Sequence, residues 1–352
     1  MAPEATDANS VLFESDAGTP DLGLKKTSVQ RADDTPWAYD WQHVIQVPFL
    51  YATGIYGAFL FFMASKWQTN LFTCLLHLMG SLGVTAGAHR LWAHKAYKAK
   101  WPLKLIVLVF QTISMQYSVI NWVRDHRMHH KYVDTDADPH NATRGLFFSH
   151  VGWLMVQKHP EYERKSKLLD ISDVEGDPML RFQKKYFFIL LPLVTFIFPT
   201  LVPVYLWQES WTNAFFVAAM FRLSLTYNMT SLVNSAAHKW GHKPYDKNIL
   251  ATEGRLLSLA FVGEGFHNYH HTFPWDYKAA EIGSSIYNLS TIFIDFFAKI
   301  GWAYDLKTVS DQVIQKRVER TGDGSHNLWG WGGKDQSKEE VDAAIRIHPK
   351  DD

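Results

Sequence analysis

Apolar residues collect in four long stretches of this 352-residue chain, and the stretches form two pairs. The first pair covers residues 44–64 and 71–88, and the second covers residues 187–206 and 211–233. A helix that crosses a bilayer needs roughly 20 apolar residues, which is close to the length of each stretch. Because only a short polar loop joins the members of each pair, we predict two helical hairpins. The pattern therefore predicts an all-α integral membrane protein with four transmembrane helices.

Two shorter apolar stretches have a mixed character. Residues 101–122 are apolar for most of their length, whereas residues 286–302 contain Asp295 and Lys299 within an amphipathic pattern. An amphipathic helix can lie in the plane of the membrane surface. We expect residues 101–122 against the membrane or in the cytosolic core, and residues 286–302 at the interface or in a soluble cap.

The polar segments predict the domain organisation and the orientation. Residues 1–36 are rich in Asp, Ser, Thr and Ala and are expected to be a polar tail without a cleavable signal. We assign residues 37–310 to a membrane domain with a helical cytosolic cap, and residues 311–352 to a polar C-terminal tail. The loops that follow each hairpin are rich in Lys and Arg, whereas the tight loops within the hairpins are not. The positive-inside rule then places both termini in the cytosol.

Charge and cysteine content exclude some classes of protein. The chain carries 35 basic and 35 acidic side chains, and this balance argues against binding to nucleic acid. Its single cysteine, Cys74, cannot form an internal disulfide. Any metal ligands must therefore be nitrogen or oxygen atoms.

Nine of the 17 histidines fall into four short groups. In two groups the histidines are spaced i, i+3 and i+4, which places three imidazoles on one side of a helix. Many imidazoles that converge on one place indicate a metal site, and nine exceed the number that one ion can bind, so we predict a dinuclear site. The candidate ligands are His89 and His94; His126, His129 and His130; Asn234 and His238; and His267, His270 and His271.

The metal site also constrains the topology. Each histidine group follows or ends a hairpin, so all four can meet on the cytosolic side. If residues 101–122 crossed the membrane, the second group would lie on the opposite side from His89. A histidine-lined metal transporter is a less favoured alternative, because it should bury histidines in mid-membrane and only His77 lies at such a depth. The other histidines, including His140, are expected to be ordinary surface or core residues.

Three of these segments resemble the histidine boxes of membrane acyl-CoA desaturases of the stearoyl-CoA desaturase type. They are His89-Arg-Leu-Trp-Ala-His94, Arg124-Asp-His-Arg-Met-His-His130 and His267-Asn-Tyr-His-His271. The resemblance extends over about residues 37–325. Tyr245-Asp-Lys and Arg320-Thr-Gly-Asp-Gly-Ser325 make the chain most similar to insect members, especially moth enzymes of pheromone biosynthesis.

The resemblance implies an enzyme of the endoplasmic reticulum membrane. It implies that two iron ions are held by the nine histidines, with Asn234 bound through a water, and that O2 is a co-substrate. It further implies an acyl-CoA substrate and electrons from cytochrome b5 and its NADH-dependent reductase. A related hydroxylase or fatty-acid conjugase remains open, because these enzymes share the step that removes hydrogen.

The match is partial at the positions that the family uses for its substrate. Arg124, Asp125 and Lys158 match positions that bind the CoA head, whereas His43 and Tyr117 replace asparagines. Asp125 is also, with Asp136, Asp138 and Glu264, a candidate to orient the histidine rings.

Other matching positions concern the acyl chain. Gln116 and Thr230 match the bend of the acyl tunnel, but Ser231 replaces a tryptophan, and we expect a reshaped bend. His77 and Ser81 stand at the blind end of the tunnel, where His77 either shortens the accessible chain or pairs with another helix.

Overall fold

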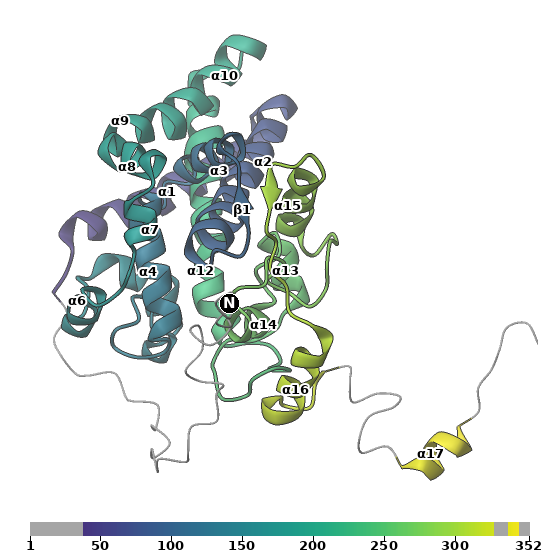
Figure 1. The fold of residues 1–352 in the computed structure, drawn as a ribbon. Helices are drawn as coiled ribbons and strands as arrows, with labels where there is room; N and C mark the ends of the chain where they lie inside the picture. The colour runs from purple at the N-terminus through teal and green to yellow at the C-terminus, as the bar shows by residue number, and fades with distance from the viewer. Residues whose placement is uncertain (1–37, 327–336, 345–352) are drawn as a thin grey trace, which may run out of the picture.

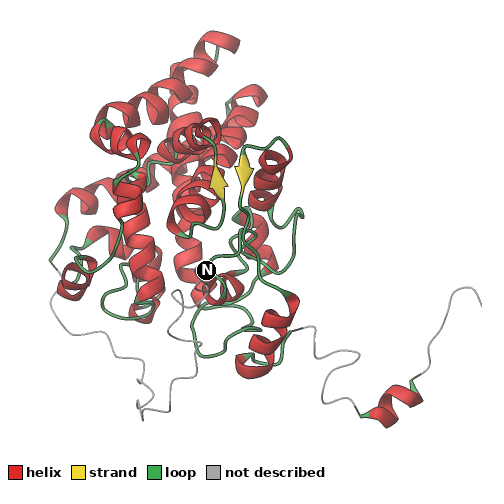
Figure 2. Ribbon diagram, in the orientation of Figure 1, coloured by secondary structure: helices red, strands yellow, loops and turns green. Residues whose placement is uncertain are grey.

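The computed structural model describes residues 38–326 and 337–344, so the predicted tail at residues 1–36 lies outside the described residues. The described part is helical, as predicted (Figures 1 and 2). Two short strands, β1 (Lys98–Ala99) and β2 (Ala303–Tyr304), pair in antiparallel fashion and join the middle of the chain to its later part.

The first predicted hairpin consists of α1 (Trp41–Met63) and α2 (Trp67–Leu82), and α2 continues without a break into the π-helix η1 (Gly83–Ala93). The carboxylate of Asp40 accepts a hydrogen bond from the backbone amide of His43 and so caps α1. The combined helix Trp67–Ala93 is 27 residues long, and its last turns carry the first candidate metal ligand, His89.

The second hairpin is also helical, but its two arms differ. Its elements are α9 (Phe187–Pro192), η4 (Leu193–Ile197), α10 (Phe198–Trp207), α11 (Trp211–Asn213), η5 (Ala214–Phe221) and α12 (Arg222–Ser235). The π-helical turn η4 directly follows Pro192, which lacks the amide hydrogen that a regular α-helix requires.

In the described part of the chain, three helices are long and apolar enough to cross a membrane: Trp41–Met63, Trp67–Ala93 and Phe187–Trp207. The predicted fourth crossing, residues 211–233, is continuously helical but less apolar because it carries Arg222 among Ser, Thr and Asn residues. Arg222 is fully buried, and its guanidinium donates to the carbonyls of Ile113 (2.5 Å) and Thr195 (2.9 Å). Backbone oxygens thus satisfy the charged group inside the protein.

Residues 101–122 do not form one long helix. Helix α3 (Trp101–Ile113) has 13 residues, too few to span a bilayer, and α4 (Val119–Lys131) begins after a break capped by Ser118. Helix α3 packs closely on η1, because a Cβ atom at Gly83 would lie 2.1 Å from the backbone nitrogen of Gln111. The segment after α4 contains η2 (Ala142–Arg144), α5 (Leu146–His150), η3 (Gly152–Met155), α6 (Pro160–Ser166), α7 (Ser172–Glu175) and α8 (Pro178–Lys185).

The last part of the chain follows α12. Its elements are η6 (Ala236–His238), α13 (Arg255–Ala260), α14 (His267–Thr272), α15 (Leu289–Lys299), α16 (Asp311–Thr321) and α17 (Lys338–Ala343). Residues 286–302 thus contain a single short helix, α15, which buries Ile294 and exposes Phe296, as an amphipathic pattern requires.

Helix α16 begins directly after the predicted boundary at residue 310. Its side chains Ile314 and Val318, one helical turn apart, are buried against Tyr245 and Tyr269. An ion pair of 2.6 Å joins Arg317 to Asp246. The polar composition of residues 311–352 did not predict this short amphipathic helix, and the domain boundary at residue 310 stays a prediction.

The largest apolar core lies between η1, α3, α4, α8 and α15. It fixes α4 against η1 and therefore fixes the relative positions of the histidines that these two elements carry. Its fully or almost fully buried members include Leu91, Trp92, Leu103, Val107, Val119, Ile120, Val123, Leu180 and Ile294.

Candidate metal centre and adjoining cavities

The nine predicted histidines converge from η1, α4, η6 and α14 into two groups. We call the first the five-imidazole group and the second the four-imidazole group; the potential ligand atoms within each lie within 4.8 Å of one another. The five-imidazole group contains His89, His94, His126, His130 and His270. The four-imidazole group contains His129, His238, His267 and His271.

The π-helix explains how the first two histidines meet. Residues five apart point in different directions on an α-helix of 3.6 residues per turn. In η1 the backbone amide of His94 instead donates to the carbonyl of His89 at 3.0 Å, which is the i to i+5 bond of a π-helix. The widened turn brings the two imidazole centroids to 4.9 Å.

Within each group the Nε2 atoms face one another at the spacing of ligands around an ion. Two nitrogens that bind one ion at right angles, each at about 2.1 Å, lie about 3.0 Å apart. The Nε2 to Nε2 distances are 2.8 Å for His94–His126, 2.9 Å for His89–His270, 3.0 Å for His130–His270, 3.0 Å for His238–His267, 3.0 Å for His267–His271 and 3.2 Å for His129–His271. The donor set therefore fits two metal ions.

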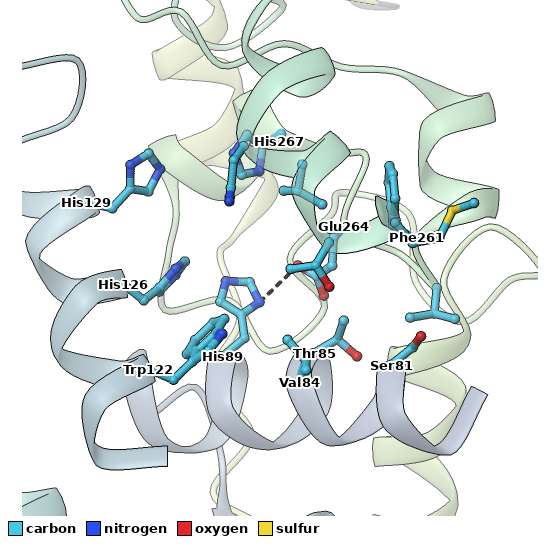
Figure 3. A pocket seen from close by; sticks show the side chains of 15 residues that line it. Ser81, Val84, Thr85, His89, Trp122, His126, His129, Phe261, Glu264 and His267 are labelled. Carbon is cyan, nitrogen blue, oxygen red and sulfur yellow. Dashed lines mark ion pairs between the residues drawn. The ribbon is translucent and has the colours of Figure 1, made fainter. Parts of the chain in front are cut away.

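Two carboxylates contact the Nδ1 atoms of imidazoles whose Nε2 atoms face the other ligands. Glu264 forms an ion pair with Nδ1 of His89, drawn as a dashed line in Figure 3, at a distance of 2.9 Å. Asp138 lies 2.9 Å from Nδ1 of His129. A carboxylate that accepts from Nδ1–H leaves the Nε2 lone pair free for a metal and fixes the ring orientation. Burial would raise the pKa of Glu264, but the neighbouring Arg90 and His89 lower it to about 2.

The remaining rings are held in the neutral form. Burial, followed by the proximity of other imidazoles, lowers the pKa of seven histidines well below the usual value. They are His94, His126, His130, His238, His267, His270 and His271. A neutral imidazole offers a lone pair, so these rings are in the protonation state that a metal requires.

Sequence proximity identified the orienting carboxylates only in part. Of the four candidates, Glu264 and Asp138 contact histidines, whereas Asp125 accepts from Lys158 (2.9 Å) and Asp136 pairs with Arg144. One neighbour was missed: His140 forms a third compact group with His129 and Asp138. Its position two residues after Asp138 was the available signal.

Three cavities adjoin one another in a row, and the last two are lined by histidines of the candidate metal centre. We call them the outer, middle and inner cavities. The outer and middle cavities share Tyr117, Trp153 and Leu154. The middle and inner cavities share Trp122, His126, Thr230 and Asn234. Figure 3 shows the inner cavity, which His89, His129 and His267 also line.

The outer cavity brings together three of the predicted CoA-binding residues, His43, Tyr117 and Lys158. Nδ1 of His43 lies 2.8 Å from Asp40, and its Nε2 lies 3.3 Å from the Tyr117 hydroxyl. The Lys158 ammonium is bound by Asp125, which lines the middle cavity. Arg124 instead pairs with Glu175 (3.2 Å) and is not among the described residues that line these cavities.

The predicted acyl-bend residues meet at the middle cavity. The Gln116 amide donates to the Thr230 hydroxyl at 2.8 Å, and Ser231 is almost fully buried in the cavity lining. At the predicted blind end, Ser81 lines the inner cavity. His77 pairs with another helix instead, because its Nδ1 lies 3.0 Å from the hydroxyl of Thr226 on α12.

Fold and site together define a class. This is a helical protein with at least three helices able to cross a membrane, and it contains two imidazole groups spaced for metal ions. The chain belongs to the fatty acid desaturase family, whose model matches residues 65–305. The resemblance drawn from the histidine groups is confirmed, and the chain is a desaturase-family oxidoreductase.

Curated relatives cover most of the chain. It is 53% identical over 352 residues to an acyl-CoA Delta-9 desaturase of Acheta domesticus, covering 98% of each chain. It is 56% identical over 288 residues to an acyl-CoA Delta(11) desaturase of Spodoptera littoralis, covering 82% of this chain and 85% of that one. A (11Z)-hexadec-11-enoyl-CoA conjugase of Bombyx mori is 54% identical over 284 residues, covering 81% of this chain and 86% of that one.

Proposed function

We propose that this protein is an acyl-CoA desaturase that converts one CH2–CH2 unit of a fatty acyl chain into a double bond. The reaction takes two hydrogens from the chain, reduces O2 with two electrons and two protons, and releases two waters. The observation that carries the proposal is the position of His126, which belongs to the five-imidazole group and also lines both the middle and inner cavities. An acyl chain in these cavities would pass directly beside the candidate metal centre.

Iron, which the resemblance to the desaturases implies, is the metal that we propose for this reaction. Imidazole suits iron, copper and zinc, but zinc has no redox chemistry and so cannot activate O2. Two iron ions would supply the oxidising power that no side chain has. We propose that the nine histidines bind them, that Asn234 reaches one ion through a water, and that Glu264 and Asp138 orient the rings. Cytochrome b5 with its reductase is the proposed electron donor.

The three cavities suggest a pose for the substrate. The CoA head would lie at the outer cavity near Lys158, His43 and Tyr117, with Arg124 at its rim. The acyl chain would then bend where Gln116 and Thr230 are hydrogen-bonded, and its tail would enter the inner cavity toward Ser81. Apolar lining residues would exclude water from the reacting carbons, and this protects the oxidising step from side reactions.

We also propose a four-helix membrane domain beneath a cytosolic cap in the endoplasmic reticulum membrane, with both termini in the cytosol. The helix from α11 to α12 would be the fourth crossing. The surroundings of its one charged side chain support this role, because carbonyl oxygens inside the protein accept hydrogen bonds from Arg222. Two complete hairpins return the chain to the side on which it began.

The test is expression in yeast that lacks its own desaturase. The wild-type chain should restore unsaturated fatty acids, and His129→Ala should abolish them and lower the bound iron. His242→Ala is the matched control, because His242 is exposed and outside both imidazole groups. A membrane-inserted, iron-loaded wild-type protein that makes no unsaturated product would overturn the proposal.

Conjugase activity is a second candidate, favoured by the Bombyx mori relative and by the replacement at Ser231. The small side chain leaves room in the middle cavity where an indole would otherwise stand. We expect Ser231→Trp to change the position or number of double bonds, as located by mass spectrometry. An unchanged pattern would show that Ser231 does not shape the product.

A further inference from the structure

One wall of the inner cavity comes from outside the histidine motifs. Phe261 and Val262 belong to the turn between α13 and α14, and both side chains line the cavity and are almost fully buried. In Figure 3, Phe261 and Ser81 lie at one end of the cavity, whereas Trp122 and His126 lie at the other. Since the middle cavity joins at Trp122 and His126, Phe261 stands at the far end of the path.

The backbone of this turn fixes the position of Phe261. Val262 has a φ of 51°, which is rare for a β-branched residue, and its carbonyl accepts from the amide (2.9 Å) and the hydroxyl (2.7 Å) of Ser290. Gly263 follows with a φ of 117°, and a Cβ atom there would lie 2.3 Å from Asn288. The turn is thus held by contacts that do not involve the Phe261 ring, so this ring can be exchanged without releasing the turn.

The same turn is tied to the metal centre. Glu264, three residues after Phe261, holds Nδ1 of His89. The Ser290 hydroxyl that supports Val262 also lies 2.6 Å from the hydroxyl of Thr85, in the π-helix that carries His89. The Phe261 ring therefore stands at a fixed distance from the five-imidazole group.

Resting on the desaturase function proposed above, we infer that Phe261 determines which acyl chain lengths the enzyme accepts. Its ring closes the inner cavity and limits the number of carbons that fit beyond the new double bond. His77 does not carry this role, because its ring is bonded to Thr226 and is not among the described residues that line the inner cavity.

In the experiment, the yeast strain expresses this protein and receives a series of saturated fatty acids of increasing length. The unsaturated products are then measured. Phe261→Ala should shift products toward longer chains, with a gain of about fourfold in relative kcat/KM for each extra methylene, equivalent to about 0.8 kcal/mol per buried CH2. Phe261→Trp should shift them toward shorter chains. The double-bond position counted from the thioester should not change, because the distance from the outer cavity to the histidines is unaltered.

Leu256→Ala is the control, since Leu256 lies on the adjoining short helix and is 84% exposed. A product profile of Phe261→Ala equal to that of wild type and of Leu256→Ala would overturn the inference and leave the proposed function standing. A moved double bond at unchanged chain length would also overturn it. If Phe261→Ala does not accumulate, Phe261→Leu must give a smaller shift in the same direction. Absence of any desaturation by the wild type would overturn the function and this inference together.

Discussion

The two imidazole groups differ in how the protein supports them. In the five-imidazole group, Glu264 holds His89 and is itself bound by the buried guanidinium of Arg90 (2.8 Å). In the four-imidazole group, Asp138 holds His129 and accepts hydrogen bonds from the backbone amides of Asp134 and His140, both at 3.1 Å.

The carboxylate that orients a histidine ring is held by distant residues in one group and by neighbouring residues in the other. Arg90 donates to the carbonyl of Tyr277 and the hydroxyl of Thr291, both at 3.0 Å, so a charged network ties η1 to the chain before and within α15. Asp138 instead lies nine residues after His129 and is held within one local loop. The first support is long-range and costly to break, whereas the second is local. The first group also supplies five imidazoles and the second only four.

The largest effect is expected for Glu264→Ala. The substitution releases His89 and leaves the Arg90 guanidinium buried without its carboxylate, and loss of one partner of a buried ion pair costs about 3–5 kcal/mol. We expect a large fall in thermal stability in detergent and the loss of about one of the two ions. Glu161→Ala is the control, because Glu161 pairs only on the surface and its loss should leave the thermal stability at the wild-type value. A variant with wild-type stability would show that the charged network does not support the fold.

A smaller effect is expected for Asp138→Asn. An amide can still accept from Nδ1 of His129 but lacks the negative charge, and loss of such an outer partner typically lowers metal affinity about 10–100-fold. Stability should change less than in Glu264→Ala, because no buried cation loses its partner. The measurement is metal affinity by competition with a chelator, together with Mössbauer spectra of the two iron sites. Equal loss of both ions would contradict the division into two separately supported groups.

The sequence predicted those parts of the site that depend on regular helical spacing, and it did not predict those that depend on an irregular helix or on contacts between distant elements. The i, i+3, i+4 spacing of His126, His129 and His130 needs only a regular α-helix, and α4 is one. The pair His89 and His94 needs a π-helix, which side-chain spacing does not reveal. Asp134 was not predicted at all: its carboxylate lies 3.8 Å from Nδ1 of His238, about a hundred residues further along the chain. Such contacts arise when distant helices and loops pack together, and the spacing of residues within one segment does not predict them.

In the fold, too, features that belong to a single segment were predicted, and features that depend on contacts between segments were not. Long apolar stretches predicted three of the membrane-length helices, because length and apolarity are properties of the segment itself. The helix ending in α12 departs from that rule, since carbonyls of α3 and η4 accept hydrogen bonds from its buried Arg222. Helix α16 was missed because only two of its side chains, Ile314 and Val318, are buried.

A modest effect is expected for Asn234→Ala. Asn234 lines both the middle and inner cavities, which histidines of both groups also line, and all nine imidazoles remain in this variant. We expect both ions to stay bound, the spectrum of one iron site to change, and desaturation to fall by about tenfold, the lower end of the range for an outer partner. Changes in the spectra of both iron sites would place Asn234 between the ions rather than on one of them.

The smallest effect is expected for His140→Phe, and it tests where the four-imidazole group ends. The His140 ring is tilted against the His129 ring, with centroids 4.3 Å apart, but its Nδ1 lies 3.6 Å from Asp138, beyond a good hydrogen bond. Its contribution to Asp138 comes through its backbone amide, which phenylalanine retains. Metal content and affinity should therefore stay within about twofold of wild type, far from the loss expected for Asp138→Asn. A loss as large as that of Asp138→Asn would make His140 a fifth ligand, and the two groups would then be equal in number and the asymmetry would lie only in their supports.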